Sequence, residues 1–276
     1  MKLPRPPDWL VYLGVVAALA WAAVAAQHRE DAPPAPPPMP ALAGPPLGPA
    51  SPFDPSVVVK APAPPEPGTG TAFSVAAGGV WLTARHVVQG CARTAIVVAP
   101  GSAVAAAVRA DRLGDTAVLF TKGGAPPLPL APPTPLRQGA MAFHPGFPGG
   151  RAGEAASRLV GRERMVTRGR GGRAQSVLAW AQVGQTAGLT ASLAGLSGAP
   201  ALDGAGRVIG VTIAQAPRRG LIYTTTPASL RAALLAAAAP RPTGGLGEPI
   251  TAADYGRVAD DLRRTLRVVP VVCLGH

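Results

Sequence analysis

The sequence Gly195-Leu196-Ser197-Gly198-Ala199-Pro200 places a serine in a run of small residues. Two motifs precede it, Thr83-Ala84-Arg85-His86-Val87-Val88 and Leu113-Gly114-Asp115-Thr116-Ala117. A serine hydroxyl becomes nucleophilic when an imidazole removes its proton and a carboxylate holds that imidazole in the right tautomer. The order His86, Asp115, Ser197 therefore predicts a nucleophilic serine. The small residues around it leave room for backbone amides to face a developing oxyanion.

The other histidines are poor candidates for the base. His28 follows an apolar N-terminal segment, and His276 is the last residue. His144 stands in a run of Gly and Pro over residues 143–150, which predicts a turn. His86 therefore remains as the predicted base.

Two aspartates lie between His86 and Ser197, namely Asp111 and Asp115. Asp115 precedes the apolar run 116–120, which predicts a strand and would place the carboxylate at a strand edge near the imidazole. Asp111 stands among polar neighbours and is expected to be solvated. Asp115 is the preferred partner of the histidine, with Asp111 as the alternative.

Around these motifs the chain resembles the trypsin-like peptidases, in particular the bacterial branch that includes the high-temperature-requirement proteases. The resemblance covers roughly residues 68–238. Residues 68–73 are similar to the family's glycine-rich opening strand, 143–150 to a Gly-Pro turn, 206–211 to the strand after the serine, and 223–235 to the closing strand and helix. The resemblance implies an all-β fold of two six-stranded antiparallel barrels of chymotrypsin type with a C-terminal helix.

The resemblance also implies a serine endopeptidase acting on protein or peptide substrates. Ser197 would attack the peptide carbonyl, His86 would accept the hydroxyl proton and pass it to the leaving amine, and Asp115 would orient the imidazole. The amides of Gly195 and Ser197 would form the oxyanion hole. No cofactor is expected.

Two departures from the family pattern flank the serine. Leu196 replaces the usual polar residue, and Ala199 replaces a glycine. With no carboxylate before the serine, the oxyanion loop is expected to be held by packing. The family position at the base of the specificity pocket corresponds to Ala191, beside Ser192, so a small or medium apolar substrate side chain is expected rather than a basic one.

The composition favours one modest domain joined to connecting segments. The 276 residues include 34 Gly and 34 Pro, and aromatic residues make up only 4%. Short runs rich in Val, Leu and Thr between Gly and Pro are typical of an all-β fold. A domain of about 170 residues buries roughly 70% of its unfolded surface, which is enough for a core without a cofactor.

The N-terminus predicts a membrane-targeting segment. Residues 1–8 carry Lys2 and Arg5, and residues 9–27 follow without a charge, which favours a transmembrane helix with its basic flank in the cytoplasm. Either a retained signal anchor or a signal peptide cleaved near residues 23–25 explains this pattern. Both export the catalytic domain to the periplasm or outside the cell, and the retained anchor would hold the protein at the inner membrane by a single pass.

The proline content of the chain predicts where the spacer ends and the protease domain begins. Residues 28–67 are Pro-rich, are expected to form neither ladder nor helix, and predict a disordered spacer. A protease domain at 68–238 follows, and residues 239–276 are predicted to be a linker, a helix starting near Asp254 and a strand at 268–274 that docks on the protease. This tail is too short for the PDZ-type peptide-binding module of high-temperature-requirement proteases.

Only two cysteines occur, Cys91 and Cys273. Export makes a disulfide between them plausible, with two separate buried thiols as the alternative. Two thiols with no suitably spaced histidine cannot furnish a structural zinc site, so no metal is expected.

The net charge of +12 raises the question of nucleic acid as a partner. The densest basic cluster spans 162–173 but has no interleaved aromatic residues for base stacking, and export would separate it from nucleic acid. A solvated loop of the second barrel is the favoured interpretation. Two noncatalytic hypotheses remain, a peptide-binding module on a protease fold and a basic scaffold for acidic polymers.

Overall fold

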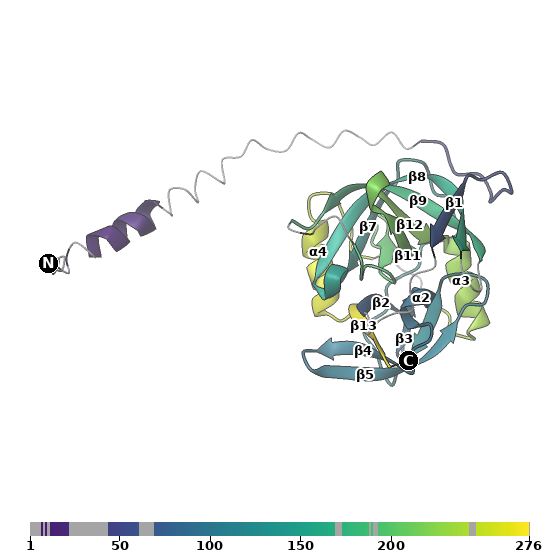
Figure 1. Ribbon diagram of the computed structural model, residues 1–276, viewed down its shortest axis with the longest axis horizontal. Helices are drawn as coiled ribbons and strands as arrows, with labels where there is room; N and C mark the ends of the chain where they lie inside the picture. The colour runs from purple at the N-terminus through teal and green to yellow at the C-terminus, as the bar shows by residue number, and fades with distance from the viewer. Residues whose placement is uncertain are drawn as a thin grey trace. The chain divides into compact units, whose positions relative to one another are not determined.

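The computed structural model describes residues 7, 9, 12–21, 44–60, 69–168, 173–187, 189, 193–242 and 247–275. The chain divides into two compact units, residues 1–41 and 42–276. In the first unit, residues 12–21 are helical (Figure 1). Within the described set, no helix has the length and apolar character that a bilayer crossing needs. Much of the predicted segment 9–27 lies outside the described residues.

The first barrel is a closed ring of six antiparallel strands. Apolar and threonine side chains fill its interior, as expected for strands that pack on a core. The strands are β2 (Thr69–Ala76), β3 (Val80–Thr83), β4 (Arg93–Ala99), β5 (Ser102–Ala110), β6 (Ala117–Phe120) and β13 (Val268–Leu274). Their order around the ring is β13-β2-β3-β6-β5-β4.

The second barrel is also a closed antiparallel ring, because β8 pairs with both β7 and β9. Its core holds Trp180, whose indole N–H donates to the Thr224 hydroxyl at 2.9 Å. The two six-stranded barrels confirm the predicted architecture. The strands are β7 (Met141–Gly146), β8 (Gly153–Arg168), β9 (Ala174–Gln185), β10 (Pro200–Leu202), β11 (Val208–Ala216) and β12 (Leu221–Thr225).

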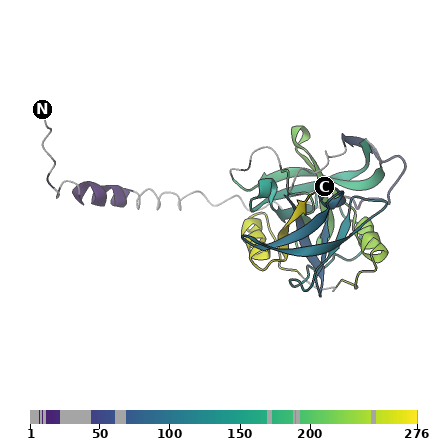
Figure 2. The ribbon, with the colours of Figure 1, turned by 60° about the horizontal axis from the view of Figure 1, so that its bottom comes forward.

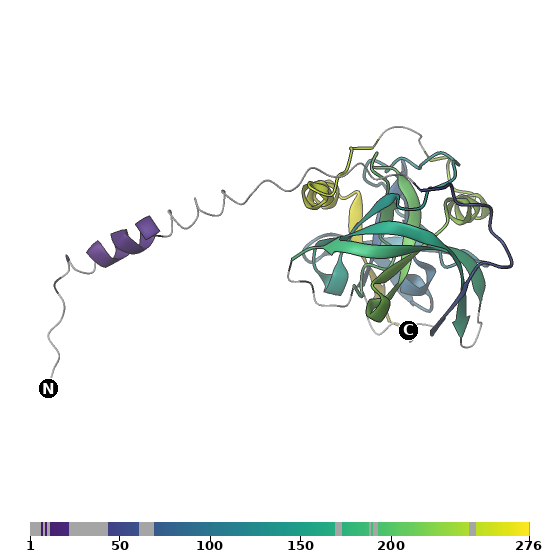
Figure 3. The same cartoon turned by 90° about the horizontal axis from the view of Figure 1, so that it is seen from above.

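Three short helices and two 3₁₀ turns connect these strands. Thr226 caps α3, as the sequence suggests, by accepting a hydrogen bond from Ser229 N. Figures 2 and 3 show α3 and α4 on opposite sides of the two-barrel body. The bounds are α2 (Arg85–Val88), η1 (Pro148–Gly150), η2 (Pro217–Arg219), α3 (Pro227–Ala236) and α4 (Tyr255–Arg264).

Part of the predicted spacer is ordered, which corrects the expectation for residues 28–67. Strand β1 (Ser56–Lys60) pairs in parallel with Arg164–Arg168 of β8. Before it, the backbone of residues 44–47 hydrogen-bonds to residues 136–138. The prediction failed because it weighed proline content over the whole segment, whereas Ser-Val-Val-Val-Lys is a local β-forming run without proline. Residues 28–43 and 61–67 lie outside the described part.

The C-terminal strand is an integral strand of the first barrel rather than a docking element, which corrects a second expectation. β13 lies between β2 and β4 and pairs with both. Figure 2 shows this yellow strand among the blue strands of the N-terminal barrel. Without it, β2 and β4 would each present an unpaired edge. The protease body therefore extends to residue 274.

Cys91 and Cys273 form a disulfide that fastens β13 to the segment after α2. Their Cα atoms are 5.3 Å apart, and 182 positions separate them in the sequence. Because long loops lose the most entropy on closure, we expect the double variant Cys91→Ala/Cys273→Ala to be about 3–5 kcal/mol less stable than wild type. Urea unfolding of residues 44–276 would measure this difference. A loss below ~1 kcal/mol would contradict it.

Candidate active site

His86 and Asp115 meet where α2 faces the start of β6. Asp115 Oδ2 lies 2.7 Å from His86 Nδ1, and Asp115 Oδ1 accepts a hydrogen bond from His86 N at 2.9 Å. The carboxylate therefore accepts hydrogen bonds from both the ring and the backbone of the histidine. Gln175, on β9 of the other barrel, accepts a hydrogen bond from Asp115 N at 2.9 Å. Residues of both barrels thus hold Asp115, His86 at its carboxylate and Gln175 at its backbone amide.

The contact at Nδ1 determines what the imidazole can do. Since Nδ1–H donates to Asp115, the opposite nitrogen, Nε2, is left as the proton acceptor. Burial of the ring lowers the pKa of His86, but the charge and hydrogen bond of Asp115 outweigh burial, and the net pKa is raised above 6.5. A neutral, oriented imidazole with a raised pKa suits a general base.

Asp111, the alternative aspartate, braces the loop before the candidate site instead of contacting the histidine. Its carboxylate accepts hydrogen bonds from Leu113 N and Gly114 N, each at 3.0 Å. Its carbonyl accepts a hydrogen bond from the Arg85 guanidinium at 2.9 Å. Asp111 therefore shapes the turn that delivers Asp115.

Ser197 lies on a loop that packs against the first barrel beside α2. Its carbonyl accepts a hydrogen bond from Thr71 N at 2.8 Å. Gly70 separates this loop from α2, because a Cβ on Gly70 would stand 3.1 Å from the Ser197 carbonyl oxygen and 2.5 Å from Val87 Cγ1. The serine is thereby placed next to the helix that carries His86. Among the described residues, no hydrogen bond joins Ser197 Oγ to the His86 ring, a bond that often tightens only when substrate binds.

Two glycines beside Ser197 have left-handed backbone conformations. Gly195 and Gly198 adopt φ values of +94° and +90°, and a Cβ on Gly198 would lie 2.0 Å from the Thr71 carbonyl oxygen. In the part of the chain that the structure describes, the amides of Gly195 and Ser197 donate to no backbone or side-chain acceptor. These two donors are therefore available to a ligand.

Leu196 holds the loop by packing, as the missing polar residue predicts. Its side chain is 1% exposed and belongs to the core of the second barrel. A Cβ on Gly146 would lie only 2.8 Å from Leu196 Cδ1, so β7 passes tightly beneath it. The loop is anchored by apolar burial instead of an ion pair.

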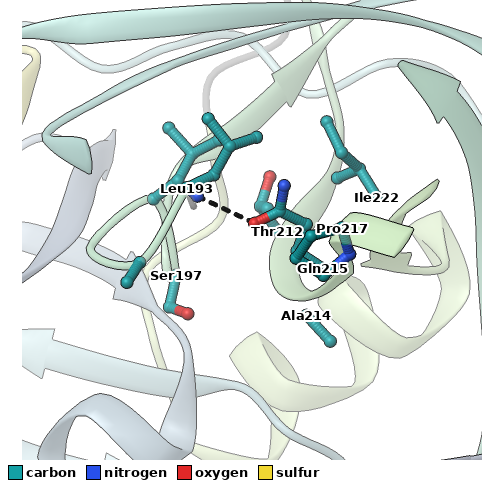
Figure 4. Close-up of a pocket in the computed structure, with 9 residues that line it drawn as sticks. Leu193, Ser197, Thr212, Ala214, Gln215, Pro217 and Ile222 are labelled. Carbon is teal, nitrogen blue, oxygen red and sulfur yellow. Dashed lines mark hydrogen bonds between the residues drawn. The ribbon is translucent and has the colours of Figure 1, made fainter. Parts of the chain in front are cut away.

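A pocket of about 240 Å³ opens beside Ser197 (Figure 4). In Figure 4, Leu193 lies on the same side of the pocket as Ser197, with Ile222 across from them, and Leu193 N donates to Gln215 Oε1 at 2.8 Å. The predicted pocket residues, Ala191 and Ser192, lie outside the described residues. The described lining contains no carboxylate and consists of Leu193, Ala194, Leu196, Ser197, Thr212, Ala214, Gln215, Pro217 and Ile222.

Sequence reasoning missed the wall supplied by β11 and β12. The strand after the serine was expected, but its side chains were not assigned to the pocket. The only available signal was the resemblance of residues 206–211 to a family strand, which ends just before the lining residues begin. Thr71 was also missed, although its hydroxyl donates to the Gly195 carbonyl at 2.8 Å.

His144 is a buried structural histidine on β7, not a turn residue as the Gly and Pro around it predicted. Its Nδ1 lies 2.9 Å from the Thr212 hydroxyl and its Nε2 lies 2.7 Å from the Ser157 hydroxyl. Burial lowers the pKa of His144 to about 3, so the ring is neutral near pH 7. Its hydrogen bond to the Thr212 hydroxyl helps to position a residue that lines the pocket.

The described residues contain no cluster of three or more His, Cys, Asp or Glu side chains that could hold a metal ion.

The paired barrels and the serine loop between them define a protein of the chymotrypsin-like class. A family model described as the trypsin-like peptidase domain matches residues 70–211, just over half of the chain. The chain belongs to the trypsin-like peptidases and is a serine endopeptidase. A search of curated proteins found no match.

The chain is similar to several solved structures. The active form of the Rv3671c protease from M. tuberculosis is 22% identical with a TM-score of 0.50, and the match covers 73% of this chain and 97% of that one. An inactive form of Rv3671c is 23% identical with a TM-score of 0.48, covering 60% and 82%. The HtrA-type protease AlgW with a decapeptide is 19% identical with a TM-score of 0.47, covering 60% and 51%. At these identities the likeness concerns the fold alone.

Proposed function

We propose that Ser197, His86 and Asp115 are the catalytic triad of this endopeptidase. The observation that carries the proposal is the two-point contact of Asp115 with His86, at 2.7 and 2.9 Å, on a helix that packs beside the serine loop. Nδ1 is committed to the carboxylate, so Nε2 is the nitrogen that can take the serine proton.

In the proposed reaction, Ser197 Oγ attacks the peptide carbonyl while His86 Nε2 accepts the hydroxyl proton. The carbonyl π electrons move to its oxygen, which the amides of Gly195 and Ser197 stabilise. The imidazolium, stabilised by Asp115, then protonates the leaving amine as the C–N bond breaks, which leaves an acyl-enzyme. Water, deprotonated by the same imidazole, releases the acid and restores the serine.

The pocket next to Ser197 supports a preference for a small or medium apolar side chain. Its described lining is mainly apolar and carries no charge, so a basic side chain would lose its hydration without gaining a counter-charge. Thr212 and Gln215 provide the polar groups that orient a ligand in such a site.

We also propose that the protein is exported and held at the inner membrane, and that it processes envelope proteins or takes part in their quality control. The uncharged run at residues 9–27 after a basic start supports targeting. The Cys91–Cys273 disulfide supports an oxidising compartment, since such bonds are rare in the cytosol.

The pH dependence of the reaction is expected to follow His86. The base must be neutral to accept a proton, and its pKa is raised by Asp115, so kcat/KM should rise with pH through an apparent pKa above 6.5 and then level off. Initial rates on a peptide ester between pH 5 and 9 would measure this profile. An activity that stayed constant down to pH 5 would argue against His86 as the base.

Labelling with a fluorophosphonate probe tests the triad directly. The probe should react with residues 44–276 of the wild type and fail to react with Ser197→Ala, and His86→Ala should label at least about a hundredfold more slowly. The Asp111→Asn variant is the matched control. A folded wild type that does not react would refute the proposal and favour a peptide-binding module on a protease fold.

A further inference from the structure

Helix α4 lies outside the segment that the family model matches, yet it places one arginine deep in the molecule. Arg263 is only 9% exposed, and its guanidinium donates to Glu154 Oε2 at 2.8 Å. Glu154 is equally buried, and its second oxygen accepts a hydrogen bond from the Thr186 hydroxyl at 2.6 Å. The arrangement is a buried ion pair with further polar partners, unlike the surface pairs elsewhere on α4.

The same guanidinium bridges the two strands of the β7–β8 hairpin at its turn end. Arg263 Nη1 donates to the Gly146 carbonyl at 3.3 Å and to the Gly153 carbonyl at 3.0 Å. Gly146 is the last residue of β7 and Gly153 is the first residue of β8, and the two are paired. One side chain therefore bridges both arms of the turn formed by residues 147–152.

That turn packs directly against residues 193–199, which we call the oxyanion loop. Gly149 N donates to the Ala194 carbonyl at 2.5 Å. A Cβ on Gly195 would lie 2.5 Å from the Phe147 carbonyl oxygen, so turn and loop are in direct contact. Thr71 joins them further, since its hydroxyl donates to the Gly195 carbonyl and accepts from Phe147 N.

We propose that Arg263 is a positioning residue for the oxyanion loop, acting through the turn at residues 147–152. The inference rests on the proposed function, because it concerns the amides of Gly195 and Ser197. Leu196 supplies no charge to fix the loop, so the loop depends on its contacts with the turn, namely the bond from Gly149 N to the Ala194 carbonyl and the Thr71 hydroxyl that joins the two segments. Arg263 fixes the position of that turn through its hydrogen bonds to the Gly146 and Gly153 carbonyls.

The test removes the guanidinium without leaving a buried charge unpaired. Arg263→Met alone would strand Glu154, at a cost that could unfold the protein. The double variant Arg263→Met/Glu154→Gln avoids this and still leaves the Gly146 and Gly153 carbonyls without their donor. Glu154→Gln alone is the reference. Arg257→Met, on the exposed side of the same helix, is the matched control.

The expected result is a fall in kcat of about 10- to 100-fold for the double variant relative to Glu154→Gln, with KM changed less than about threefold. A displaced oxyanion hole weakens transition-state binding while leaving ground-state binding intact. Arg263→Lys, which keeps the charge but cannot bridge two carbonyls and a carboxylate, should show a smaller loss. A folded double variant with the kcat of the reference would overturn the proposal.

Amide hydrogen exchange tests the proposal without measuring activity. The loop contains protected amides at Leu196, Gly198 and Ala199, each donating to a backbone carbonyl at 2.8–2.9 Å. Their exchange should be about tenfold faster in the double variant and unchanged in Arg257→Met. Equal exchange in the double variant and the reference would overturn the role of Arg263. Failure of the wild type to react with the fluorophosphonate probe would instead refute the proposed triad.

Discussion

Removal of residues 268–276 is expected to leave no folded protease. β13 lies between β2 and β4, and its Val268, Val269 and Val271 side chains are completely buried in the first barrel. Each buried valine contributes roughly 1.5–3 kcal/mol, and the lost disulfide contributes further. The sum rivals the 5–15 kcal/mol that stabilises a typical domain. Circular dichroism and urea unfolding of the truncated chain would measure the loss.

A shorter deletion distinguishes the effect of losing β13 from the effect of losing the residues after it. Removing Gly275 and His276 alone leaves the β13 ladder and Cys273 intact, so stability should stay within ~1 kcal/mol of wild type. A synthetic peptide with the sequence of 268–276 should restore fluorophosphonate labelling to the long truncation, because strand addition satisfies both exposed edges. A long truncation that unfolds cooperatively and labels at the wild-type rate would show that the barrel does not need β13.

Replacement of Asp115 by asparagine is expected to lower kcat about 10⁴-fold with little change in KM. The carboxylate accepts from His86 Nδ1–H at 2.7 Å. An amide NH₂ in its place would donate to Nδ1, which would put the ring proton on Nε2, where the serine needs an acceptor. The variant should also remove the raised pKa of His86 and shift the acid limb of kcat/KM to lower pH.

Asp111→Asn is the control for this substitution, because both aspartates stand in the same loop. The Asp111 carboxylate accepts from two loop amides, and among the described residues it has no hydrogen bond or ion pair with the histidine. Its loss should cost less than about tenfold in kcat. Similar losses in the two variants would show that the loop as a whole matters, not the contact between Asp115 and the imidazole.

Much of the fold was predictable where short-range chemistry decides. Thr226 followed by Pro227 predicts the start of α3, and the structure has that cap. The apolar run Val268–Leu274 predicts a strand, and β13 has these bounds. The preference for Asp115 over Asp111 rested on its position before an apolar strand, and Asp115 is the one that meets His86.

Other predictions failed where distant segments compete for one partner. His144 was expected in a turn, but β8, β10 and the hydroxyls of Thr212 and Ser157 draw it into the core as part of β7. Residues 162–168 were expected in a solvated loop, yet they belong to β8. Strand β9 pairs with residues up to Val166, and β1 pairs with residues from Arg164 on. The content of Gly, Pro and Arg indicates only the local conformational preference of a segment. Strand pairing with distant segments overrides that preference here.

The sequence by itself determined the class of fold, the identity and order of the candidate triad residues, and the local form of α3 and β13. These follow from side-chain chemistry and from patterns within a few residues. Only the tertiary structure decided that β13 closes the first barrel and that Arg263 supports the oxyanion loop through the β7–β8 turn. Both contacts join residues more than a hundred positions apart, and such pairings depend on how the whole chain packs, which no local pattern encodes.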